Sequence, residues 1–108
     1  MEQITWEEAQ MLFTDNKNYF VMFTTSWCPD CKMMKLGLKN VIAKFNNKPI
    51  KFIEIDAEQA NLFRKNEDGW QVLKVPAFFI VKKNKHQFVG YEYVPMPIIE
   101  KAITDALQ

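Results

Sequence analysis

Cys28 and Cys31 are the only cysteines of the chain, and two residues separate them. Thiols at this spacing can bind a metal, form a permanent disulfide or cycle between dithiol and disulfide. A zinc site needs about four ligands, and the sole histidine, His86, lies far away in the sequence. Haem attachment would require a histidine after Cys31, where Lys32 stands instead. Because a disulfide across so short a loop removes little chain entropy, the spacing favours a redox-active pair.

The segments on either side of the cysteines decide how the two thiols are positioned. Residues 19–25 form an apolar run typical of a strand that is buried on both faces. Residues 29–46 then repeat apolar side chains at helical spacing. Cys28 falls at the start of this helix, where free backbone N–H groups and the helix dipole stabilise a thiolate. We therefore expect Cys28 to be the nucleophile and Cys31, one turn further along, to be the resolving thiol.

The rest of the chain alternates between helices and strands. The patterns predict a capped helix that starts at Thr5 and ends near Asp15, strands over 50–56 and 77–81, a helix over 57–65 that ends at 66–69, a hairpin partner over 87–91 and a closing helix from Pro97. This order predicts an α/β fold with helices on both faces of a central mixed sheet. The length of 108 residues fits a single domain over 1–108.

Composition and charge narrow the classes of function. The formal net charge is +1, which argues against binding to nucleic acid or to a membrane surface. The first ten residues carry acidic rather than basic side chains, and no apolar run has the length of a membrane span. The sequence therefore predicts a cytoplasmic protein. In a reducing cytosol, a close cysteine pair is typical of catalysis, redox sensing or metal binding.

Several motifs together resemble the thioredoxin family over nearly the whole chain: Trp27-Cys28-Pro29-Asp30-Cys31 between strand and helix, Val75-Pro76 before an apolar strand, and Gly90 in the hairpin. The resemblance implies a thioredoxin-like fold of three α/β/α layers around a mixed sheet of four or five strands. It also implies that Pro76 follows a cis peptide bond, faces the dithiol across a substrate groove and, with Val75, positions the substrate. The same comparison places Trp27, Pro29, Trp70 and Gly90 at the groove, although Trp27 fits a packing role equally well and Trp70 fits one better.

The chain departs from this family near the dithiol. Pro29-Asp30 between the cysteines resembles thioredoxin-related proteins with a Trp-Cys-Pro-Asp-Cys motif. The buried carboxylate that thioredoxins carry six residues before the first cysteine is replaced by Met22, and Phe52 replaces the lysine that usually accompanies it. We therefore hypothesise that Asp30 or a water handles the proton of the resolving cysteine. Asp30 is otherwise a stabilising first-turn acid of the helix.

Three further departures lie elsewhere in the chain. Leu36 and Gly37 stand where the family helix carries a proline. Residues 57–69 form a longer segment than in a typical thioredoxin, and the first strand is shortened to residues 1–4 or absent. These differences leave the fold expectation in place but remove the family template for part of the groove.

The sequence predicts a cytosolic thiol–disulfide oxidoreductase that acts mainly as a disulfide reductase through a mixed disulfide. Its substrates would be disulfide-containing proteins or small molecules, and its electrons would come from an NADPH-dependent, thioredoxin reductase-like partner. We expect a monomer with no bound metal, flavin or other cofactor besides the redox-active Cys28–Cys31 pair. The alternative is a redox-switched binding or sensor module without turnover. An oxidase or isomerase is disfavoured because the sequence shows no secretory signal.

Overall fold

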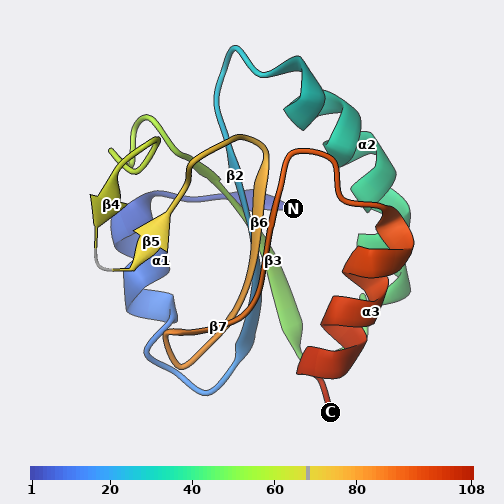
Figure 1. Cartoon of the computed structure of the whole chain (residues 1–108). Coiled ribbons are helices and arrows are strands. Elements are labelled where there is room, and N and C mark those ends of the chain that lie inside the picture. The colour runs from blue at the N-terminus through green and yellow to red at the C-terminus, as the bar shows by residue number, and fades with distance from the viewer. Residues whose placement is uncertain (68) are drawn as a thin grey trace.

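The computed structural model of the chain describes residues 1–67 and 69–108 and places most of the strands in one sheet. Within these residues, the sheet has five strands in the order β1 (Glu2–Gln3), β3 (Ile50–Asp56), β2 (Asn18–Thr24), β6 (Ala77–Lys82) and β7 (Lys85–Tyr91). β1, β3 and β2 are parallel, whereas β6 runs antiparallel to both β2 and β7 (Figure 1). The predicted mixed sheet is confirmed, with a first strand of only two residues.

Helices cover both faces of this sheet. α1 (Trp6–Leu12) lies on one side, and α2 (Pro29–Lys44) and α3 (Met96–Ala106) lie on the other (Figure 1). The predicted α/β/α arrangement is therefore confirmed. Among the described residues, no helix is both long and apolar enough to cross a membrane.

The capping box predicted for the first helix is present, because the Thr5 hydroxyl accepts the Glu8 N–H and the Glu8 side chain accepts the Thr5 N–H. α1 nevertheless ends at Leu12, earlier than predicted. The Asp15 carboxylate accepts the backbone N–H of Lys17 at 2.8 Å and the Tyr19 hydroxyl at 2.7 Å. Such local side-chain bonds compete with helical ones, so the chain turns into β2 instead of extending the helix.

β2 is buried along its whole length, as predicted for a central strand. Because successive strand side chains point to opposite faces, it contributes to two separate cores. Tyr19, Val21 and Phe23 belong to the core on the α1 face, and Phe20 and Met22 to the core under α2 and α3. The sheet therefore divides the interior into two packed regions.

The helix predicted over 57–65 is wrong. The structure has turns there, and Asn61 and Arg64 have positive φ angles of 58° and 57°. Non-glycine residues rarely adopt this left-handed region, and it ends a right-handed helix. The chain instead continues into a hairpin of β4 (Asn66–Glu67) and β5 (Trp70–Gln71). Asp68, within the predicted end of the helix, lies outside the described residues.

The closing helix α3 begins at Met96, one residue before the predicted Pro97, and buries Ile99 and Ile103 against the sheet. Its first turn approaches Gly37 of α2. A methyl group at Gly37 would lie 2.9 Å from the Met96 Cε atom, closer than ordinary packing allows. The glycine therefore leaves room for the end of the Met96 side chain, which lies against α2.

Candidate active site

One edge of the sheet gathers the segments that the sequence singled out. Thr24, the last residue of β2, pairs with Asp56, the last residue of β3, and Phe23 pairs with Ala77 at the start of β6. The loop to α2 and the Val75-Pro76 bond therefore leave the sheet at the same edge. In open α/β sheets, sites form in the crevice beyond the carboxyl ends of the parallel strands.

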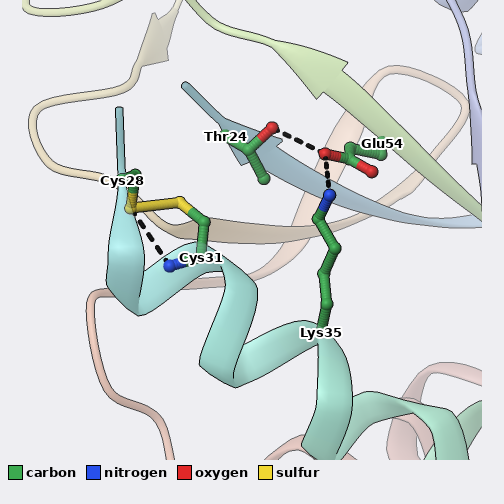
Figure 2. Close-up of polar contacts among 5 residues, drawn as sticks. All are labelled: Thr24, Cys28, Cys31, Lys35 and Glu54. Carbon is green, nitrogen blue, oxygen red and sulfur yellow. Dashed lines mark hydrogen bonds and ion pairs between the residues drawn. A yellow bond between two sulfur atoms is a disulfide. The ribbon is translucent and has the colours of Figure 1, made fainter. Parts of the chain in front are cut away.

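Cys28 and Cys31 form a disulfide at the first turn of α2, with Cα atoms 5.3 Å apart. Cys28 is the N-cap residue, and its Sγ accepts the backbone N–H of Cys31 at 3.1 Å (Figure 2). Pro29 opens the helix, a position where its missing N–H costs nothing. Cys28 is 4% exposed and Cys31 1%. Both are buried, with Cys28 the more accessible of the two.

The Val75-Pro76 peptide bond is cis, as the resemblance implied. Val75 is partly buried and packs against both cores, including the one that contains the two cysteines. The Pro76 carbonyl accepts the Glu92 N–H at 2.7 Å. Gly90 lies in β7 opposite Phe78, where a side chain would come within 3.0 Å of Val94. Gly90 thus leaves room for the side chains of Val94 and Phe88.

Trp27 is 55% exposed and lies immediately before the disulfide. Its indole N–H donates to the Glu58 carboxylate at 3.0 Å, and its ring meets Phe63 edge-on at 5.6 Å between centroids. Both partners belong to the segment 57–69, which therefore holds one edge of the indole and leaves much of the ring open to solvent.

The structure corrects the expectation that Trp70 lines the groove. Trp70 is 6% exposed and lies in the core on the α1 face, whereas the cysteines lie in the core on the opposite face. Its ring stacks on Phe13 at 5.5 Å and contacts His86 edge-on at 4.3 Å. Burial in this aromatic cluster lowers the pKa of His86. The packing role is the one that these contacts support, because the β4–β5 hairpin folds Trp70 inward.

Asp30 is exposed in the first turn of α2. Among the contacts of the described residues, no hydrogen bond or ion pair involves its carboxylate. Its position fits the stabilising effect of a first-turn acid on the helix dipole.

The sequence analysis did not single out Glu54, a carboxylate on β3 that is 7% exposed. Its Oε2 atom accepts the Thr24 hydroxyl at 2.7 Å and lies 2.7 Å from Lys35 Nζ on α2 (Figure 2). Glu54 is the register partner of Met22, the position where the resemblance implied a buried acid. The available signal was a lone acidic residue within the apolar run of 52–55. The missing information was the strand register.

Glu54 and the disulfide line the same hollow of about 200 Å³. Its other walls include Thr24, Lys35 and Asp56. Within the part of the chain that the structure describes, no group of three or more His, Cys, Asp or Glu side chains could hold a metal ion. The site thus combines a cysteine pair at a helix start with a buried, hydrogen-bonded carboxylate.

Comparison with known proteins relates this arrangement to one family. The thioredoxin family model matches residues 2–103. The thioredoxin of Mycoplasmopsis pulmonis (strain UAB CTIP) is 36% identical over 107 residues, which cover 97% of each chain. A thioredoxin of Ophiophagus hannah is 30% identical over 89 residues, or 81% of this chain and 80% of the relative.

Solved structures show the same fold. Mitochondrial thioredoxin 3 of Saccharomyces cerevisiae in its oxidised form superposes with a TM-score of 0.77 at 23% identity, covering 97% of this chain and 94% of the other. Thioredoxin of Trypanosoma brucei brucei gives a TM-score of 0.78 at 20% identity, over 96% and 88% of the two chains. With the Cys28–Cys31 pair in place, the chain is a thiol–disulfide oxidoreductase and belongs to the thioredoxin family.

Proposed function

We propose that the chain is a disulfide reductase in which Cys28 attacks the substrate and Cys31 releases it. The position of Cys28 at the N-cap of α2 carries this proposal. The N–H of Cys31 points at Cys28 Sγ, and the positive end of the helix dipole lies at the same place. Both favour the thiolate form of Cys28, which is the nucleophilic form. The greater exposure of Cys28 supports the same order of attack.

The reaction then proceeds in two exchanges. The Cys28 thiolate attacks one sulfur of the substrate disulfide, forming a mixed disulfide and expelling the other sulfur as a thiolate. Cys31 next attacks Cys28 Sγ, the Cys28–Cys31 disulfide forms, and the second substrate sulfur leaves. The two electrons gained by the substrate come from the cysteine pair, and a reductase partner that draws on NADPH restores the dithiol.

Substrate binding is assigned to the surface beside the dithiol. Pro76 has no N–H, and its carbonyl is occupied by Glu92, so an extended substrate would pair with the backbone of Val75. The exposed ring of Trp27 and Pro29 would border the same groove. We expect the chain to act as a monomer in the cytosol, where cellular reductants keep such a dithiol reduced.

Turnover tests the proposal. The reduced protein is mixed with catalytic thioredoxin reductase, excess NADPH and DTNB, and NADPH oxidation is followed. We expect many turnovers per protein molecule, no turnover for Cys28→Ser, and a trapped mixed disulfide for Cys31→Ser. A reduction potential near −270 mV, the value for thioredoxin, would agree with a reductase. The proposal would be overturned if the protein were oxidised only once per molecule with every disulfide reductase offered as donor. That result would favour a redox-switched module.

A further inference from the structure

We infer that Glu54, held by Thr24 and Lys35, accepts the proton of the Cys31 thiol when Cys31 resolves the mixed disulfide. The inference rests on the proposed function, because it concerns the second of the two exchanges. It assigns the proton to a carboxylate one strand away from Met22 rather than to the exposed Asp30.

The first support is the burial of the Glu54 carboxylate. An ionised carboxylate is costly to bury unless it is paired and hydrogen-bonded. Thr24 and Lys35 supply one hydrogen bond and one ion pair, both to Oε2. A carboxylate offers about four lone-pair sites, so Glu54 retains the capacity to accept a further hydrogen bond or a proton.

The second support is the hollow that connects Glu54 with the thiols. Cys31 lines this space of about 200 Å³ together with Glu54, and a water takes roughly 30 Å³ in the liquid. Several waters therefore fit in the hollow that the thiol and the carboxylate share. Thr25, which also lines the hollow, has a buried hydroxyl oxygen without a hydrogen-bond partner among the described residues. Buried polar atoms are normally satisfied, so this hydroxyl is a natural partner for a water in the path.

The third support comes from the other charged groups around the hollow. Lys32 and Lys35 face it from α2, and Asp56 faces it from the end of β3. One oxygen of Asp56 already accepts the N–H groups of Glu58 and Gln59 at 2.9 and 3.1 Å. Asp56 therefore acts as a cap for the following turn, and Glu54 is the more deeply buried acid of the two.

The proton and electrons balance without a further reactant. The Cys31 thiol transfers its proton through water to the Glu54 carboxylate, and the resulting thiolate attacks Cys28 Sγ. The Cys28–Cys31 bond forms as the bond between Cys28 and the substrate sulfur breaks, and the substrate leaves as a thiolate. Glu54 then returns the proton through the hollow to solvent or to the departing thiolate.

The reaction of the reduced protein with excess DTNB separates the two exchanges, because each releases one thionitrobenzoate. The first release reports attack by Cys28, and the second reports resolution by Cys31. For Glu54→Gln we expect an unchanged first release and a second release slowed about 100-fold at pH 7, the lower end of what a positioned base contributes. The second rate should then rise about tenfold per pH unit toward the thiol pKa, since it follows the thiolate fraction. The wild-type rate should rise less steeply.

The controls separate this effect from damage to the fold. Glu100→Gln removes the acid of another ion pair of α2, with Lys44, and should leave both releases unchanged. Asp30→Asn is not a control but a test of the competing acid, and it should not slow the second release. Glu54→Asp keeps a carboxylate and should resolve at least about tenfold faster than Glu54→Gln. The double variant Glu54→Gln with Lys35→Met removes both charges and so leaves neither of them unpaired. Its second release should be as slow as that of Glu54→Gln.

The outcomes distinguish the two proposals. No release from the wild type, or release that persists in Cys28→Ser, would overturn the proposed function itself. The role of Glu54 alone would be overturned if the wild type gave both releases and the second release were not slowed in Glu54→Gln. If Glu54→Gln does not fold, the double variant takes its place in this comparison. An effect of Asp30→Asn as large as that of Glu54→Gln would overturn the role of Glu54 as well.

Discussion

The two faces of the sheet differ in what they bury. The α1 face holds an aromatic cluster in which Trp70 contacts Phe13, Phe23 and Phe79. The α2 face holds the disulfide. Of the buried polar or charged side chains among the described residues, Thr24, Thr25 and Glu54 all line the hollow beside that disulfide. The sheet thus separates an aromatic core from a region in which polar side chains are buried beside the disulfide.

Strand alternation produces this separation. In β3, Ile53 and Ile55 point into the aromatic core, whereas Phe52 points into the opposite core. Glu54 has the same parity as Phe52 and meets Thr24 of β2 and Lys35 of α2. A change in the aromatic core should therefore alter stability alone, whereas a change at the polar site beside the disulfide should alter redox chemistry as well as stability. The following variants test that division.

Trp70→Ala should have the largest effect on stability. It removes the centre of the aromatic cluster and leaves a cavity, which costs about 3–5 kcal/mol for a large aromatic side chain. The free energy of unfolding, measured by urea denaturation, should fall by that amount. The rate of mixed-disulfide formation per folded molecule should remain unchanged. A comparable loss of rate would show that the two faces are coupled.

Lys35→Met should have an intermediate effect. It leaves the buried Glu54 carboxylate with the Thr24 hydrogen bond alone. Fully buried pairs cost more when broken, but the Lys35 side chain is 39% exposed, so we expect a loss of roughly 1–3 kcal/mol. Adding Glu54→Gln should recover much of this loss in a denaturation experiment. If the double variant were less stable than Lys35→Met, the charge of Glu54 would not be the cause.

The aromatic face also predicts a dependence of stability on pH. Burial lowers the pKa of His86 below its ordinary value of 6.5, so the unfolded chain binds this proton more readily than the folded one. The contribution of His86 is fully present above pH 6.5 and is lost as the pH falls through 6.5 toward the lower folded pKa. The difference between the melting temperatures of His86→Phe and wild type should therefore grow between pH 7 and pH 5. A difference that is constant with pH would contradict this.

Glu100→Gln should have the smallest effect. Its partner Lys44 is 66% exposed, and exposed ion pairs contribute about 0–1 kcal/mol. Glu54→Gln should be measured in the same denaturation series. The difference between the two losses of unfolding free energy then gives the effect of burial on a lysine–glutamate ion pair. Equal losses of unfolding free energy for the two variants would mean that the buried Lys35–Glu54 pair contributes no more to stability than the exposed Lys44–Glu100 pair.

The sequence predicted what depends on local patterns. The apolar run of β2, the capping box at Thr5 and the amphipathic helix that starts at the cysteines each have a signature within a few residues. Together they placed the dithiol at a strand-to-helix transition. The cis bond before Pro76 followed from the family resemblance.

The errors concern features that depend on distant contacts. Residues 57–65 have a helix-like composition, but Phe63 pairs with Val72 and the left-handed Asn61 and Arg64 break the helix. Trp70 was placed by analogy, and only the folded hairpin shows which core it enters. Glu54 was missed because a search at a fixed distance before Cys28 looks along one strand. Glu54 lies beside Met22 on the neighbouring strand, and only the pairing register of β2 with β3 shows this.

The three tryptophans also report on two different places, the aromatic core and the surface next to the disulfide. Trp6 and Trp70 contact each other at 5.0 Å within the aromatic cluster, whereas Trp27 is half exposed and precedes the disulfide in the chain. Because a disulfide quenches the fluorescence of a nearby indole, reduction should brighten Trp27 and leave the emission of the other two almost unchanged. A Trp27→Phe variant would then report unfolding alone. The unmodified chain carries its own redox indicator and its own folding indicator in separate fluorophores.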